Sequence, residues 1–301
     1  MISLITQIVE KHPEWLRGSG APLSFLKLST ASLGRYSEEG KVLIFVFEDR
    51  QASPTLCIKT VRRYSAGDLI KRNYHNLQVL EKETRGSSFI DMFARPLDFY
   101  DDGETIFVIE TICPGSMFSA QIQKMSIVIE KYTAWQTYLA RLSNEAWTIF
   151  DIQELVFDLI ESLTLAEESP LVLHDYYNRL NLDFNIRLPR IVQHGDMTPD
   201  NVLISDKNVY LIDYDYVDFT RLPGFDLFNF LMKSKSQKNF FPDNYERYFL
   251  EYFKMIGAEV EAVEGLLFVY YLLEIKRKNN RGGQKNSQEI IKDFSALINK
   301  T

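Results

Sequence analysis

The first third of the chain alternates apolar and polar residues in short runs, a pattern that predicts β-strands. Turn-forming residues separate these runs, which are rich in β-branched and aromatic side chains. They cover residues 23–30, 41–48, 55–61, 92–100 and 105–112. Between the third and fourth runs, apolar residues recur at helical spacing over 66–83, which predicts one helix. The short links between the first three strands favour an antiparallel meander.

After a Cys-Pro-Gly break at 113–115, the pattern becomes mainly helical. Long helical periodicities cover 119–144, 149–168, 240–256 and 260–276. Two short apolar runs, at 202–204 and 209–212, interrupt them and are joined by Ser-Asp-Lys-Asn, which predicts a hairpin. We therefore predict an α+β fold with a small β-rich lobe at 1–112 and a larger, mainly helical lobe at 113–301.

Composition and charge exclude several classes of protein. Lys and Arg number 34 against 41 Asp and Glu, and the net charge of −7 argues against a dedicated nucleic-acid partner. No apolar run approaches the roughly 20 residues of a membrane-spanning helix, and the first residues lack the pattern of a signal peptide. The two cysteines, Cys57 and Cys113, are too few for a disulfide framework. We expect a cytoplasmic protein without membrane insertion.

The polar residues around the predicted hairpin are the candidates for chemistry. Asp196 follows His194 and Gly195 in a loop, Asn201 comes five residues later, and Asp213 ends the second apolar run. Because a hairpin folds back on itself, Asn201 and Asp213 can face each other across its open end, and such oxygen ligands suit Mg²⁺. Phosphoryl transfer needs these metal ligands together with a carboxylate that accepts the proton of a hydroxyl. Isolated turn residues would need no such order, so the ordered set favours function.

These residues resemble the aminoglycoside phosphotransferase and choline/ethanolamine kinase superfamily of small-molecule kinases. The His-Gly-Asp-x-x-x-x-Asn loop and the later Ile-Asp-Tyr-Asp match its two signature motifs, and Gly224 to Phe230 continues the choline kinase version. The best-matched region is 190–232. The resemblance implies a protein-kinase-like bilobal fold, in which residues 1–112 form the nucleotide-binding lobe and residues 113–301 form the catalytic and substrate lobe.

The resemblance also implies roles for individual residues of the two motifs. Asp196 would be the catalytic base, Asn201 and Asp213 would bind Mg²⁺, and Asp215 would face the substrate. Asp215 stands where the choline kinases have a longer Glu, so its reach is shorter. Two further residues would support the catalytic loop, namely His194 and Asp226, the latter through backbone amides.

In the first lobe, Lys59 interrupts an apolar strand after a turn, as the phosphate-binding lysine of kinases does. The resemblance implies that main-chain groups near Thr111 and Cys113 bind adenine. Two features depart from the family. Asn73 stands where a helix Glu would pair with the lysine, and the loop at 29–34, which would cover the nucleotide, has a single glycine. A basic run at 276–281 is interpreted as a solvated helix end.

Two hypotheses follow. The leading one is an ATP- and Mg²⁺-dependent kinase that phosphorylates a hydroxyl of a small molecule, which is an amino alcohol such as choline or ethanolamine, an aminoglycoside or a sugar. The alternative is a pseudokinase that binds nucleotide or serves as a scaffold without turnover, and the two departures are its support.

Overall fold

The computed structural model describes residues 1–18, 22–29, 40–48, 51–118, 122–142, 147–163, 170–180, 185–206, 208–238, 245–260, 263–279 and 287–298. By its internal contacts the chain divides into two compact units. The first unit consists of residues 1–118 and 200–217, and the second consists of residues 119–199 and 218–301. The hairpin residues therefore group with the first unit, whereas the sequence pattern placed them with residues 113–301.

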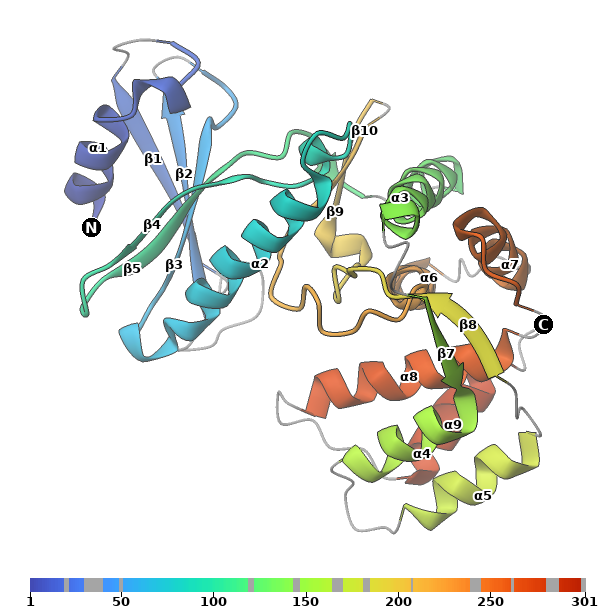
Figure 1. Ribbon diagram of the computed structural model, residues 1–301. Coiled ribbons are helices and arrows are strands. Elements are labelled where there is room, and N and C mark those ends of the chain that lie inside the picture. The colour runs from blue at the N-terminus through green and yellow to red at the C-terminus, as the bar shows by residue number, and fades with distance from the viewer. Residues whose placement is uncertain are drawn as a thin grey trace. The chain divides into compact units, whose positions relative to one another are not determined.

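The first unit contains one five-stranded antiparallel sheet (Figure 1), which confirms the strands expected in this part of the chain, although the fourth begins at Pro96 and not at Met92. Its strand order is β1-β2-β3-β5-β4, so the first three strands form the expected meander. The strands are β1 (Leu23–Ser29), β2 (Lys41–Glu48), β3 (Leu56–Val61), β4 (Pro96–Asp101) and β5 (Ile106–Thr111).

Helices α1 (Ile2–Glu10) and α2 (Asp68–Thr84) cover opposite faces of this sheet (Figure 1). On the α1 face, buried side chains such as Ile44 and Ile58 pack against the helix. On the α2 face, Ile70 of the helix packs against Ile106 and Val108. Since side chains alternate along a strand, the residues between these apolar positions project toward the opposite face. Lys41, Lys59 and Glu110 are such residues, and they belong to the α2 face.

A second, three-stranded sheet carries the predicted hairpin. Strands β9 (Val202–Ser205) and β10 (Asn208–Leu211) pair antiparallel, and β6 (Ser116–Met117) pairs with β9 on its other edge. This pairing, together with a hydrogen bond from the Phe118 amide to the Val202 carbonyl, ties the hairpin to the first unit. The hairpin prediction is confirmed.

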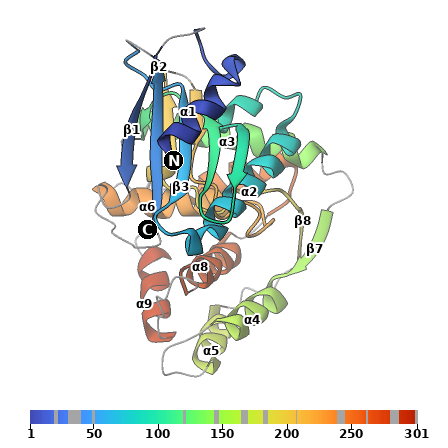
Figure 2. The ribbon, with the colours of Figure 1, turned by 90° about the vertical axis from the view of Figure 1, so that its left-hand side faces the viewer.

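The second unit is mainly helical, as the pattern predicts, with one strand pair, β7 (Trp147–Asp151) and β8 (Asn185–Pro189). Its helices in the described residues are α3 (Ile122–Leu142), α4 (Ile152–Ser162), α5 (Leu171–Leu180), α6 (Phe225–Lys238), α7 (Tyr245–Ile256), α8 (Glu264–Asn279) and α9 (Ser287–Ile298). Figure 2 shows β7 leading directly into α4, with α5 beside that helix. None of the helices in the described residues is both long enough and apolar enough to cross a bilayer.

The helix predicted over 149–168 begins later than expected. Residues 147–151 pair with 185–189 as strands, and Asp151 then caps α4 by accepting a hydrogen bond from the Glu154 amide. The strand partner lies far away in the sequence, so local periodicity could not reveal it.

Candidate active site

Asp226 holds the loop that carries Asp196 by accepting hydrogen bonds from its backbone. The two carboxylate oxygens of Asp226 accept the backbone amides of His194 and Gly195, with nitrogen–oxygen distances of 2.6 and 2.8 Å. Burial raises the pKa of Asp226 to about 7, and the hydrogen bonds from the two amides oppose this shift. Because Asp226 accepts both amides, it fixes the backbone immediately before Asp196, and this is the backbone contact that the resemblance implies for Asp226. His194 is fully buried and takes part through its backbone.

A buried polar network, which the sequence pattern did not predict, surrounds this brace. The side-chain oxygen of Gln193 accepts hydrogen bonds from the Tyr132 hydroxyl, at 2.9 Å, and from the Asp226 amide, at 3.4 Å. The Gln193 amide group donates to Gln136 at 2.7 Å, and Gln136 also accepts from the Tyr252 hydroxyl. Because such groups are costly to bury unless they are paired, the network specifies one conformation for the loop.

Asp196 itself forms an ion pair with Arg277 of α8. Its Oδ1 lies 2.7 Å from Nη1 of the arginine, and only 5% of the Arg277 side chain is exposed. The interpretation of the basic run at 276–281 as a solvated helix end is therefore wrong for Arg277. This residue points into the protein and contacts the predicted catalytic base.

In the first unit, the open end of the hairpin brings the predicted metal ligands together. The Ile212 amide donates to the Asn201 carbonyl at 3.0 Å, so Asn201 lies opposite the residue that precedes Asp213. Asp213 has a φ of 67°, in the left-handed region, which few residues other than glycine, Asn and Asp adopt. No group of three or more His, Cys, Asp or Glu side chains with metal-binding geometry occurs among the described residues. Any metal here would need ligands from outside that set, such as phosphates.

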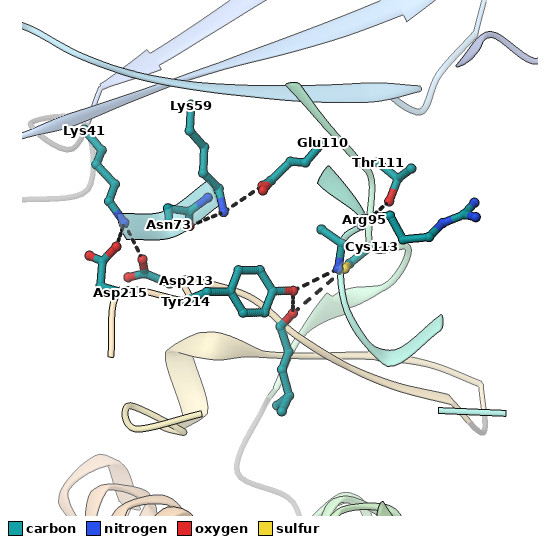
Figure 3. Close-up of polar contacts among 12 residues, drawn as sticks. Lys41, Lys59, Asn73, Arg95, Glu110, Thr111, Cys113, Asp213, Tyr214 and Asp215 are labelled. Carbon is teal, nitrogen blue, oxygen red and sulfur yellow. Dashed lines mark hydrogen bonds and ion pairs between the residues drawn. The ribbon is translucent and has the colours of Figure 1, made fainter. Parts of the chain in front are cut away.

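One lysine holds both acids at this end of the hairpin (Figure 3). Lys41, the first residue of β2, has its Nζ 2.8 Å from Asp213 Oδ1 and also contacts Asp215 Oδ1. Burial lowers the pKa of Lys41, but attraction to the two carboxylates outweighs this effect, so the pKa is raised. Asp215, predicted to face a substrate, is thus paired within the chain.

Lys59 has a partner that the resemblance did not supply. Its Nζ lies 2.6 Å from Glu110 Oε1 of β5 and 3.5 Å from Asn73 Oδ1 of α2 (Figure 3). Both charged side chains are buried. Burial lowers the pKa of Lys59, and attraction to Glu110 more than restores it, so the pKa is raised. Glu110 therefore takes the place of the missing helix Glu. Its signal in the sequence was a carboxylate inside an apolar strand.

Tyr214 anchors the segment between the two acids of the hairpin. Its hydroxyl donates to the Leu211 carbonyl and accepts the Ala94 amide, and its carbonyl accepts the side-chain amide of Asn76. The ring also lies under Lys59, with Nζ 5.1 Å from the centroid. One buried tyrosine thus connects the position of the acids to that of the lysine.

The predicted adenine-binding segment is partly occupied by contacts within the chain. Thr111 and Arg95 exchange two hydrogen bonds, from the Thr111 amide to the Arg95 carbonyl and from the Arg95 amide to Thr111 Oγ1. The Cys113 thiol contacts the Leu211 carbonyl, and burial raises the pKa of this thiol to about 12. Adenine binding near Thr111 and Cys113 stays a prediction. Residues 30–34 of the loop predicted to cover the nucleotide lie outside the described residues.

Comparison with solved structures identifies the fold. The choline kinase LicA from Streptococcus pneumoniae matches with a TM-score of 0.53 and 13% identity over 97% of this chain and 99% of LicA. A putative fructosamine-3-kinase from Haemophilus somnus matches with a TM-score of 0.52 and 13% identity, covering 96% of each chain. The aminoglycoside phosphotransferase APH(3'')-Id from Streptomyces rimosus, in complex with ADP and streptomycin, matches with a TM-score of 0.50 and 14% identity, covering 92% of this chain and 99% of its own.

The predicted α+β, protein-kinase-like fold is thereby confirmed, and so is the resemblance at the level of the fold. No protein-family model matches the sequence, and neither does any curated protein.

Proposed function

We propose that this protein is an ATP- and Mg²⁺-dependent phosphotransferase that transfers the γ-phosphate to a hydroxyl group of a small molecule. The observation that carries the proposal is the cation site at the open end of the hairpin. There Asp213 and Asp215 share the ammonium group of Lys41, beside Asn201, in a fold common to small-molecule kinases.

The residues present fit the magnesium ion and the nucleotide. The Lys41 ammonium is a cation already held by these carboxylates, and Mg²⁺ prefers one or two carboxylates together with waters and phosphates. Asn201 and Asp213 would hold the metal. Beside Lys59, the Asn73 amide nitrogen is buried without a hydrogen-bond partner among the described residues. An anionic phosphate oxygen would satisfy this donor and the lysine together.

The chain's own residues perform the remaining tasks of the transfer. Asp196 would orient the acceptor hydroxyl and take its proton, and Asp226 would keep the loop still through the His194 and Gly195 amides. Lys59, held by Glu110, would bind phosphate oxygens. Bound Mg²⁺ neutralises the charge of the phosphates.

The acceptor stays open among four chemical classes. Amino alcohols, aminoglycosides and sugars follow from the sequence, and fructosamines join them because the neighbours are a choline kinase, a putative fructosamine kinase and a phosphotransferase with bound streptomycin. The ion pair of Asp215 with Lys41 reduces the negative charge available to a cationic acceptor. The pseudokinase alternative loses one of its two supports, because Glu110 supplies the carboxylate that Asn73 lacks.

The test is a screen of the purified protein for ADP release. Amino alcohols, sugars, fructosamines and aminoglycosides are each offered with ATP, in the presence of Mg²⁺ or of EDTA. We expect turnover with at least one acceptor, dependent on Mg²⁺ and lost in Asp196→Asn. If ATP binds in calorimetry but no acceptor is phosphorylated, the pseudokinase alternative is correct.

A further inference from the structure

A buried chain of ion pairs runs from Asp196 into helix α8. Arg277 Nη1 lies 2.7 Å from Asp196 Oδ1, and the exposed fractions of the two side chains are 5% and 14%. Arg277 also donates from Nε and Nη2 to the two oxygens of Glu274, at 2.7 and 2.9 Å. Glu274 lies three residues earlier on the same helix and is 1% exposed. The guanidinium plane is therefore fixed on one edge by Glu274 and presented to Asp196 on another.

The anchor for this arginine is stabilised in its charged form. Burial raises the pKa of Glu274, but hydrogen bonds from Arg277 and nearby positive charges outweigh burial, so the pKa is lowered. Lys233 of α6 and Lys278 also contact Glu274, at 3.2 and 3.3 Å. Glu274 is thus held from two helices, and Arg277 cannot swing away without breaking two hydrogen bonds to this buried carboxylate.

A purely structural role for Arg277 does not explain its contact with Asp196. Basic residues near the end of a helix stabilise its dipole, and this accounts for Lys276 and Lys278. It does not account for a buried guanidinium that contacts an acid on another segment. Buried ion networks often stabilise a fold less than apolar residues of similar size would, so stability alone gives little reason for this one.

We infer that Arg277 is a positioning residue that sets the orientation of the Asp196 carboxylate, with Glu274 as its anchor. The inference rests on the proposed function, since it assigns a partner to the proposed base. A charge-assisted contact to Oδ1 selects one rotamer of Asp196 and so the direction from which the carboxylate meets a hydroxyl. In a loose phosphoryl-transfer transition state, the proton moves late and positioning contributes more than basicity. A fixed arginine supplies that positioning.

The test uses the full chain with an acceptor found by ADP release. Arg277→Met should lower kcat by about 100-fold, the effect of a misplacement of roughly 1 Å, while the KM for ATP stays within about twofold. Arg277→Lys should retain more of kcat than Arg277→Met does, because it keeps the positive charge. It should not reach the wild-type value, because it lacks the planar guanidinium that binds Glu274 and Asp196 together. Glu274→Gln should lower kcat less, since Arg277 remains. The matched control is Arg247→Gln, which removes an exposed arginine of α7 paired with Glu251 and should leave kcat unchanged.

Chemical rescue separates positioning from folding. Circular dichroism and melting temperature first establish that the variants are folded, and guanidinium ion is then added to Arg277→Ala. Recovery of kcat by guanidinium, but not by NaCl at equal ionic strength, is expected. A kcat within about threefold of wild type in folded Arg277→Met, or a loss seen only in the KM for ATP, would overturn the inference while the proposed function stands. Inactivity of the wild-type protein toward every acceptor would overturn both.

Discussion

The two regions that carry the candidate chemistry hold their acids in opposite ways. In the first unit, Asp213 is 44% exposed and shares a single ammonium group, that of Lys41, with Asp215. In the second unit, Asp196 is nearly buried and meets a guanidinium that is itself fixed by two further hydrogen bonds to Glu274. A lysine on a flexible stem can be exchanged for another cation, whereas an anchored arginine cannot move without breaking its anchor.

We infer from this contrast that the first site allows its cation to be replaced, whereas the second keeps one cation in place. A metal that binds Asp213 must displace the Lys41 ammonium, and the 44% exposed side chain of Asp213 leaves that carboxylate accessible to it. A base that orients a hydroxyl must keep one geometry throughout the reaction. The predictions below test this difference.

The largest effect is expected at the exchangeable site itself. Asp213→Ala should remove Mg²⁺-dependent turnover, because it deletes the proposed charged metal ligand, while the melting temperature changes little at a loop-edge position. Asn201→Ala should weaken turnover less, since this ligand is neutral. The readout is the rate of ADP release as Mg²⁺ is titrated. Wild-type-like activity in Asp213→Ala would remove the proposed metal site.

A smaller but still large effect is expected at the fixed site. Asp196→Asn keeps the shape but removes the charge, and it should lower kcat by about 10³-fold with little change in the KM for ATP. Asp215→Asn should instead raise the KM for the acceptor, most strongly for a cationic one. Steady-state kinetics on both variants measures the split. If the two patterns are exchanged between the variants, the roles assigned to the acids are reversed.

Glu110 provides a fixed ion pair in the same unit as Lys41, and its loss should appear in stability. Glu110→Gln leaves Lys59 buried without its carboxylate and should lower the free energy of unfolding by about 3–5 kcal/mol. Asn73→Ala removes a longer contact of 3.5 Å and should cost about 1 kcal/mol. Urea denaturation gives both values. Equal losses would mean that Glu110 is no more important to Lys59 than Asn73 is.

Exchange at Lys41 can be measured without turnover. Lys41→Met removes the competing ammonium, so Mn²⁺ should bind about fivefold more tightly in the absence of nucleotide. Electron paramagnetic resonance counts the free ion. Lys71→Met is the matched control, because Lys71 pairs with Asp101 at 3.1 Å in the same unit and lies outside the proposed metal site. Weaker Mn²⁺ binding in Lys41→Met would contradict the idea that the lysine is replaced by the metal.

The last prediction concerns stability alone, through the pH dependence of Asp226, which braces the fixed site. Because the pKa of Asp226 is raised from 3.8 to about 7, the folded state holds a proton that the unfolded state has lost across this range. This group therefore contributes stability below its ordinary pKa and loses it as pH rises toward 7, by at most about 1.4 kcal/mol per pH unit. The measurement is the urea midpoint of wild type and of Asp226→Asn as a function of pH, from roughly 4.5 to 8, the range over which the folded and unfolded states differ in protonation. An identical pH dependence in the two proteins would contradict the shift.

Local patterns determined much of the first unit. Alternating apolar residues define β2 and β3, and a Ser-Asp-Lys-Asn turn defines the hairpin, because side-chain periodicity and turn chemistry are written in adjacent residues. The same locality exposed Asp196, Asn201 and Asp213, which lie within one short stretch. Strands β7 and β8 were not predicted, because two helices separate them in the sequence and local patterns do not reveal such a distant partner.

The sequence by itself therefore determined the fold class, the strands and helix of the first sheet, the hairpin and the acids of the motifs. Only the tertiary structure decided which basic residue meets each acid. Lys41 lies 172 residues from Asp213, Glu110 reaches Lys59 from a neighbouring strand, and Arg277 belongs to a run that looked solvated. The residues next to a charged side chain in the sequence do not indicate which residue will be its ion-pair partner. Strand register and helix packing choose that partner, because a buried charge must be paired wherever the chain folds to supply one.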